Sequence, residues 1–420
     1  MQRRKCYIRR LRFLLATYGT RGDVHPMLAL SLALMRKGHE VVLAGPPEFG
    51  SDAARLNVTY HAMGGNMTAF LAKNAAAMGG NIVRMARVLK SEIHSEMAKQ
   101  FDLLSGLAKL ADHVVGASLA FAARSCAEAS GRPYHFISFA PETFPSRFHP
   151  ALSVRRQNLP RWVNRLSWWA ARKLDDWLLR EAFNRGRARL GLAPLTDALD
   201  HFIVPGHSLL ATDAELAPTP SDVHLPAAPT GAMLLDEPGH LPAHVEAFLS
   251  AGLPPIYIGF GSMPDARPEQ TRERLVEVVR KVGRRAILYV GNSAPAEALV
   301  GTDILLVGAL PHALLFPRVS VAVHHGGAGT TSRAARAGIP QVILPHVLDQ
   351  FPWSARIAAR GLGPRPFLSH RPGVGPLVSR IREVLENGTM QARAANLGQE
   401  LSGRDGADRM AEILEGSAHG

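Results

Sequence analysis

The chain has 420 residues, of which 46% are hydrophobic and 20% charged, which is typical of a globular protein with room for two domains. No apolar run approaches the ~20 residues of a membrane-spanning helix, and the short apolar run 13–16 behind the basic N-terminus lacks a signal-peptide cleavage site. Two distant cysteines, Cys6 and Cys126, exclude a disulfide or zinc scaffold and favour a reducing, cytoplasmic location, with membrane association left open.

The formal net charge of +13 is concentrated in two segments. Residues 1–12 carry six basic and no acidic side chains, and residues 147–189 carry eleven basic and three acidic ones. A nucleic-acid enzyme would spread its basic residues across a binding face, so we expect no nucleic-acid partner. The two patches fit contact with an anionic membrane surface, or simply solvated positive faces.

The N-terminal half opens with the pattern of a Rossmann-like βαβ unit. We expect a strand over 11–18, a loop over 19–26, a helix over 27–37 and a strand over 40–44. Further expected elements are the strands 113–116, 135–138 and 208–211 and the helices 81–110 and 119–130. The region 150–190 is amphipathic and rich in tryptophan and arginine, which indicates a pocket for a lipophilic molecule, a membrane contact or an ordinary packing helix.

A proline-rich segment, 217–242, has the composition of a linker, and the strand and helix pattern restarts after Pro255. We expect strands over 256–260, 286–290, 304–307, 319–324 and 341–344, helices over 268–281 and up to 337, and two terminal helices beyond Pro376. The predicted domains are 1–216, a linker 217–242, a second domain 243–395, and a C-terminal helix 396–420 that packs back on the first domain.

The most informative motif is a glycine-rich turn between a predicted strand and a predicted helix. It contains His325, Gly327, Ala328, Gly329 and Thr330. Glycines let backbone N–H groups approach a ligand closely, and a helix N-terminus offers unpaired donors and partial positive charge. The turn therefore suits a diphosphate, with His325 adding a donor and potential positive charge, although a purely structural turn is the alternative.

Asp349 and Gln350 follow the next predicted strand, at the edge of an α/β sheet where ligands bind. A carboxylate beside a carboxamide supplies the acceptors and donors that adjacent sugar hydroxyls need. The alternative is that Asp349 only caps a helix.

The span 310–366 closely resembles the nucleotide-sugar signature of family 1 glycosyltransferases, in particular the bacterial natural-product and glycopeptide enzymes and the sterol glucosyltransferases. The segments TYGTRGDVHPMLALSLALMRKGHEVVLA and YIGFGSM resemble the openings of that family's two domains, whereas 60–220 matches nothing specific. The resemblance implies an α/β GT-B fold, in which two Rossmann-like domains face each other across a cleft. The donor would bind the C-terminal domain and the acceptor the N-terminal one.

The resemblance also implies roles for single residues. His325 and the donors of Gly327, Ala328, Gly329 and Thr330 would hold the diphosphate, Asp349 and Gln350 the sugar hydroxyls, Gly261 and Ser262 the phosphates from the other side, and Leu310 to His312 the base. Many relatives place a base-stacking tryptophan near Leu310, and this chain has none there.

Asp23 aligns with the general base of the family, and His25 is the competing candidate. One carboxylate can take the acceptor proton in an inverting transfer, whereas a histidine base needs an orienting carboxylate, and 112–120 offers none where plant relatives have one. Asp23 as a helix cap is the structural alternative. Thr20 and Arg21 are predicted to contact the diphosphate from this side.

The resulting hypothesis is a metal-independent, inverting transfer of a hexose or deoxyhexose from a UDP- or dTDP-sugar to a hydroxyl of a lipophilic small molecule. It needs no cofactor, because the nucleotide sugar is a co-substrate. Two rivals remain: a nucleotide-sugar epimerase, and a non-catalytic helper or lipid-binding protein with the same fold.

Overall fold

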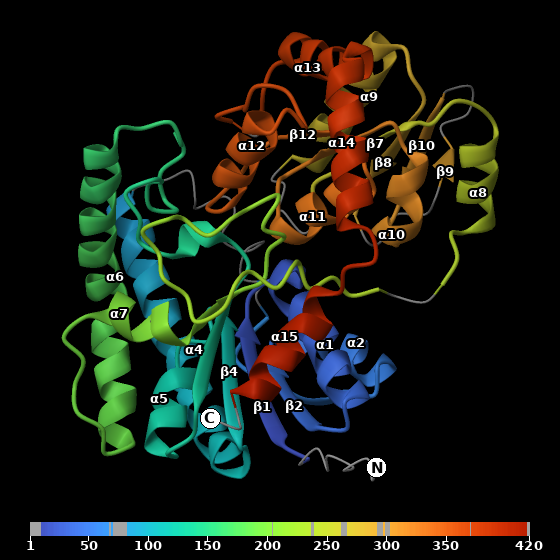
Figure 1. The fold of residues 1–420 in the computed structure, drawn as a ribbon. Coiled ribbons are helices and arrows are strands. Elements are labelled where there is room, and N and C mark those ends of the chain that lie inside the picture. The colour runs from blue at the N-terminus through green and yellow to red at the C-terminus, as the bar shows by residue number, and fades with distance from the viewer. Residues whose placement is uncertain are drawn as a thin grey trace, which may run out of the picture.

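The computed structural model describes residues 10–66, 82–203, 205–236, 239–261, 267–291, 303–369 and 371–417, together with residue 69 and the pair 297–298. They form two α/β halves, one above the other in Figure 1, each built on its own six-stranded sheet. None of the described helices is both long enough and apolar enough to cross a lipid bilayer.

The N-terminal sheet is parallel throughout and has the strand order β3-β2-β1-β4-β5-β6. Its strands are β1 (Arg12–Tyr18), β2 (Glu40–Gly45), β3 (Thr59–Ala62), β4 (His113–Ser118), β5 (Tyr134–Ser138) and β6 (Ser208–Leu210). Its main helices are α1 (Arg21–Arg36), α2 (Gly50–Arg55), α4 (Ile82–Leu110), α5 (Ala123–Ala129), α6 (Arg161–Arg189) and α7 (Ala198–Phe202). The predicted strands and helices of this half are all present, and β3 is an additional short edge strand.

Helix α1 begins six residues earlier than the sequence pattern indicated. Thr20 is the N-cap and Asp23 the third helical residue, and together they form a capping box. Pro26 therefore lies inside the helix rather than in a loop. The prediction of a loop over 19–26 was wrong, because the capping box starts the helix ahead of a proline that usually marks a boundary.

The C-terminal sheet has the order β12-β11-β7-β8-β10-β9, and only β9 is antiparallel to its neighbour. Its strands are β7 (Ile256–Gly259), β8 (Ala286–Tyr289), β9 (Glu297–Ala298), β10 (Ile304–Val307), β11 (Val321–His324) and β12 (Gln341–Ile343). The helices of this half are α8 (Ala243–Ser250), α9 (Pro268–Val282), α10 (His312–Leu315), α11 (Ala328–Arg336), α12 (Gln350–Ala359), α13 (Val374–Glu386) and α14 (Gly388–Leu401).

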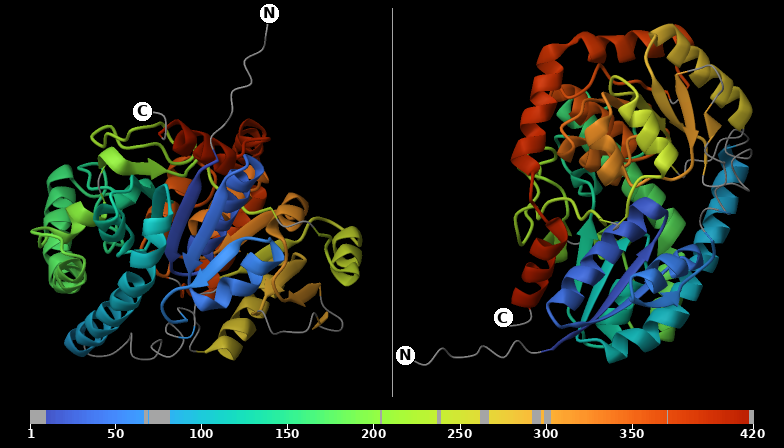
Figure 2. Two further views of the ribbon diagram at one scale, coloured as in Figure 1. Left: turned by 90° about the horizontal axis from the view of Figure 1, so that it is seen from below. Right: turned by 90° about the vertical axis from the view of Figure 1, so that its right-hand side faces the viewer.

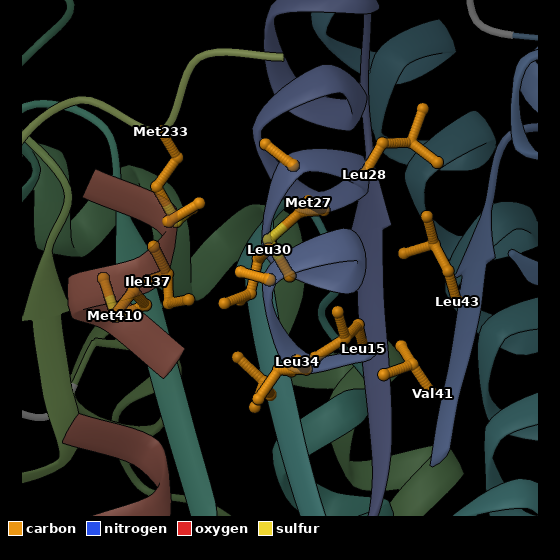
Figure 3. Packing of buried hydrophobic residues seen from close by; sticks show 14 of the residues in the cluster. Leu15, Met27, Leu28, Leu30, Leu34, Val41, Leu43, Ile137, Met233 and Met410 are labelled. Carbon is orange, nitrogen blue, oxygen red and sulfur yellow. The ribbon is translucent and has the colours of Figure 1, made fainter. Parts of the chain in front are cut away.

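The chain ends in α15 (Gly406–Gly416), which returns to the N-terminal half and packs against α1. Met410 joins the same buried cluster as Leu30 and Ile137, as Figure 3 shows. Arg36 pairs with Asp408 at 2.6 Å across this contact. The tail thus holds three helices rather than two, and α14 packs against α11 of the C-terminal half.

Two further contacts join the halves. Ala140 and Leu216 share one apolar cluster with Trp353 and Ile357 of the C-terminal half. The proline-rich segment 217–242 packs on the N-terminal half over much of its length, and Met233 is part of the core in Figure 3. The two sheets are therefore held at a defined separation by buried apolar contacts.

Candidate active site

The turn between β11 and α11 is built around a buried histidine, His324. Its Nε2 lies 2.9 Å from Gln341 Oε1, and its Nδ1 accepts from the Gly326 N–H at 3.0 Å. Gly326 has a φ of 92°, and a Cβ there would come within 2.6 Å of Ile343 Cγ2. Sequence reasoning missed His324, because its partner in the neighbouring strand is not apparent from the motif.

His325 lies between two glycines from different loops. A Cβ on Gly327 would come within 2.6 Å of His325 Nε2, and a Cβ on Gly261 within 3.1 Å of His325 Cε1. Gly261 therefore lies against the His325 ring, and its contact with phosphates stays a prediction, whereas Ser262 lies outside the described residues. Both glycines leave room for the imidazole to lie over the turn.

Helix α11 offers its N-terminus at this point. Gly327 is the N-cap and makes no side-chain cap, and Ala328, Gly329 and Thr330 form the first turn and are all partly exposed. The first N–H groups of a helix have no intrahelical acceptor and carry partial positive charge. The turn can therefore donate several backbone hydrogen bonds to one anion.

Burial lowers the pKa of His325 to about 3, and the neighbouring His324, His346 and His312 lower it further. A ring with this pKa is neutral at pH 7, so it lacks the positive charge that we expected. Among the described residues, His325 Nδ1 has no hydrogen-bond partner although it is buried. The ring thus provides an N–H donor for an incoming oxygen.

Asp349 and Gln350 open helix α12 at the carboxyl end of β12. The buried Gln350 side chain accepts from the backbone N–H groups of His346 at 2.7 Å and Val347 at 3.2 Å. The Gln350 Oε1 atom therefore holds the loop before α12. The predicted contact of Gln350 with a sugar hydroxyl would have to come from its amide nitrogen. Leu348, in the same loop, has a φ of 45°, a strained conformation for a non-glycine residue.

Asp349 remains partly exposed, and burial raises its pKa to about 7, with the negative charges of Asp23 and Glu142 adding to the effect. Asp23 and Glu142 belong to the N-terminal half, and Asp349 belongs to the C-terminal half. Helix α1, which carries Asp23, contacts α11 of the C-terminal half, so the predicted base and the predicted sugar ligand lie on the facing sides of the two halves.

Asp23 is held by three donors. Its Oδ2 accepts from the Thr20 N–H at 2.7 Å and from the Thr20 hydroxyl at 3.2 Å, and its Oδ1 accepts from the Ser118 hydroxyl at 2.6 Å. Burial raises the pKa of Asp23, and these hydrogen bonds oppose the rise. Gly19 permits the close approach, because a Cβ there would lie 2.2 Å from Asp23 Oδ2. Ser118, with a φ of 51°, is a partner that no sequence pattern indicated.

His25 contacts other residues than Asp23 does. Its Nε2 lies 3.4 Å from Asp52 Oδ2 of α2, and its ring meets Phe49 edge-on at 6.4 Å. Asp23 and His25 are two positions apart on α1, and such residues are separated by about 200° around the helix axis. His25 thus faces α2 while Asp23 faces β4 and Ser118.

The predicted base-reading segment lies beside β7. His312 Nε2 is 3.1 Å from the Tyr257 hydroxyl, and its ring stacks on Phe316 at 4.3 Å. Burial lowers the pKa of His312 to about 3, and the charge of Arg21 contributes. Leu310 packs against the core beside this segment.

An ion pair joins the two halves beside α12. Arg356 Nε donates to Glu142 Oε1 at 2.7 Å, and the second guanidinium nitrogen contacts the same oxygen. Glu142 is buried in the turn after β5. Sequence reasoning missed both residues, because they lie in different halves.

Two family descriptions match the chain. Residues 13–148 match Glycosyltransferase family 28 N-terminal domain, and residues 272–416 match Erythromycin biosynthesis protein CIII-like, C-terminal domain. Among solved structures, the glycotransferase of kitacinnamycin is similar, with a TM-score of 0.70 and 19% identity over 97% of this chain and 99% of that one. These matches cover both halves.

The sequence is 34% identical to Glycosyltransferase GtfE of Amycolatopsis orientalis, over 84% of this chain and 85% of that protein. It is 32% identical to Sterol 3-beta-glucosyltransferase UGT80B1 of Arabidopsis thaliana, over 95% of this chain and 67% of that protein. It is also 31% identical to O-mycaminosyltylonolide 6-deoxyallosyltransferase of Streptomyces fradiae, over 96% and 97%. The chain therefore belongs to the GT-B glycosyltransferase family that includes these natural-product and sterol glycosyltransferases.

Proposed function

We propose that this glycosyltransferase moves a hexose or deoxyhexose from a UDP- or dTDP-sugar to a hydroxyl of a lipophilic small molecule, with inversion and without a metal ion. The observation that carries the proposal is the contact between α1, which holds Asp23, and α11, whose N-terminus follows the His325 turn. The glycine-flanked His325 turn lies at the N-terminus of α11 and supplies the diphosphate donors.

In the proposed step, the acceptor oxygen forms a bond to C1 of the sugar while the bond from C1 to the diphosphate oxygen breaks. The acceptor proton passes to an Asp23 carboxylate oxygen. The leaving diphosphate takes the bonding electron pair, and the backbone N–H groups of α11 and the His325 N–H stabilise its charge. Direct displacement on an α-linked donor yields a β-glycoside.

Asp23 is preferred to His25 as the base on geometry. Hydrogen bonds from Thr20 and Ser118 hold the Asp23 carboxylate at the carboxyl end of β4. His25 is directed instead at Asp52 and Phe49. Asp52 would orient an imidazole base, so a His25 mechanism predicts that Asp52→Asn also stops transfer.

The substrate classes rest on the relatives. Their names specify a glucosyl group and a 6-deoxyallosyl group, with a sterol and a macrolide-type acceptor. The glycosyltransferase VinC, with a similar fold, was solved in complex with dTDP. A hexose or deoxyhexose donor and a lipophilic alcohol acceptor are the common features. We place the reaction in the cytoplasm, where such donors are available.

The test is a transfer assay with UDP-glucose and dTDP-glucose and a panel of hydrophobic alcohols, read by mass spectrometry. A glycoside supports the proposal, an epimerised donor supports the epimerase rival, and binding without any product supports the non-catalytic rival. Asp23→Asn is expected to abolish transfer and retain donor binding. Asp303→Asn is the matched control. Asp303 is exposed and lies at the amino end of β10, whereas the candidate site lies at the carboxyl ends of the strands.

A further inference from the structure

Helix α6 exposes large apolar side chains outside the hydrophobic core, and of these the Trp177 ring lies under Lys90 Nζ at 5.0 Å. Trp162 is 69% exposed, Leu166 54% and Trp169 60%, and Trp177 follows at 44%. At about 1.5 Å per residue, these four side chains span about 22 Å of the helix. We name Trp162, Leu166, Trp169 and Trp177 the α6 stripe.

The opposite face of α6 already accounts for its packing. Trp168, Leu179 and Phe183 are buried, and the Trp168 indole donates to the His149 carbonyl at 3.1 Å. A packing helix needs these residues, whereas the stripe contributes nothing to the core. Exposed tryptophans in a contiguous row mark an interaction surface.

Basic side chains flank the stripe. Arg161, Arg165 and Lys173 are exposed, and no carboxylate of the described residues forms an ion pair with any of them. Phe148, 39% exposed, extends the apolar surface at the start of α6 and lies under the guanidinium groups of Arg147 and Arg161. The surface thus combines indole rings with uncompensated positive charge.

The position of α6 leaves this surface accessible. Figures 1 and 2 both show α6 at the outer edge of the N-terminal half. Its inner side packs against α4 and α7. A broad, flat partner can therefore approach the whole length of the stripe.

We propose that the α6 stripe and its flanking Arg161, Arg165 and Lys173 dock the protein on an anionic lipid surface. Tryptophan side chains prefer the boundary between lipid headgroups and acyl chains, and basic side chains bind anionic headgroups next to it. The helix lies parallel to the bilayer plane and inserts only its outer face. This association is peripheral and independent of the donor site.

The first test is sedimentation of the full-length protein with phosphatidylcholine vesicles, with and without 30 mol% phosphatidylglycerol as the anionic lipid (about one lipid in three). The expected result is salt-sensitive binding to the anionic vesicles only. W162S/W169S and R161Q/R165Q/K173Q should each weaken this binding by at least about tenfold. Retained binding in both variants would overturn the proposal, because it would then arise elsewhere, for example in the basic residues 1–12.

Matched controls separate the stripe from general stickiness and charge. Leu253→Ser removes an exposed apolar side chain of the C-terminal half, and R272Q/R284Q removes exposed charges there, and both should leave vesicle binding unchanged. Trp162 and Trp169 fluorescence should be quenched by brominated lipid. Stripe-dependent dimerisation measured by light scattering, with no vesicle binding, would also overturn the proposal and assign the surface to a second copy of the chain.

Discussion

The Ser118 hydroxyl donates to Asp23 Oδ1 at 2.6 Å, so the last residue of β4 orients a carboxylate on the first turn of α1. Ser118 adopts a φ of 51° to do so, a conformation that non-glycine residues rarely adopt. Strain of this kind is commonly found where a side chain must be aimed at a functional site. The two residues are 95 apart in the chain, and they meet because β1, which precedes α1, is paired with β4 in the sheet.

Ser118→Ala should therefore impair the base without removing it. The hydrogen bond lowers the pKa of Asp23 against the larger raising effect of burial, so its loss raises that pKa. Because the base acts as a carboxylate, the acidic limb of the kcat/KM profile should move to higher pH, and the rate at pH 7 should fall about tenfold. Ser105→Ala on α4 is the control, and an unchanged pH profile for Ser118→Ala would refute the positioning role.

Gly327→Ala should weaken donor binding while the protein stays folded. Gly327 has an ordinary φ of −64°, so alanine suits its backbone, but the new Cβ would meet His325 Nε2 at 2.6 Å and displace the ring. We expect the dissociation constant for a nucleoside diphosphate to rise at least about tenfold and Tm to change little. Gly375→Ala, where a Cβ meets open space, should change neither quantity.

Asp349→Asn should stabilise the protein at pH 8 and not at pH 4. Between these values the folded protein retains a proton on Asp349 up to about pH 7, whereas the unfolded chain releases it near pH 4, so stability falls as the pH rises through this window. Asparagine does not titrate, and the gain at pH 8 should be about 1–2 kcal/mol, allowing for partial solvent exposure. Thermal melts at both pH values check this, and an equal effect at both would contradict it.

Glu142→Gln should weaken the contact between the two halves beside α12. It leaves Arg356 partly buried without its carboxylate, which typically costs about 3 kcal/mol when a buried pair loses one partner. A lower Tm and a raised KM for the donor are expected. Glu215→Gln, in the more exposed pair with Arg404, should have a much smaller effect, and a double-mutant cycle with Arg356→Gln measures the coupling.

Most of the architecture was predictable because its signals are local. The apolar strands, the glycine-containing turns and the spacing of helical residues placed both sheets, and the strand 304–307 agrees residue for residue. The start of α1 was misplaced because two local signals conflicted: a proline that suggested a loop and a capping box that began the helix. The tail was expected to form two helices, whereas it forms three, and α13 and α14 are separated by Asn387 alone.

The site was predictable only where its residues stand in one motif. The His325 turn and Asp23 could be proposed from their motifs, whereas Ser118, Glu142 and His324 contact partners from other segments of the chain. The engagement of Gln350 with the loop before it was also hidden, because a carboxamide next to an aspartate suits both a ligand and a backbone cap. Long-range pairing is the information that a single sequence lacks.

The central claim is that the turn at His325 holds the diphosphate of a sugar nucleotide. Calorimetric titration of the wild-type protein and of His325→Ala with UDP, dTDP and their glucose derivatives tests it most directly. We expect measurable binding of at least one of these ligands to the wild type and a loss of at least about tenfold in His325→Ala. Absence of binding to every ligand, or equal affinity of the two proteins, would contradict the claim.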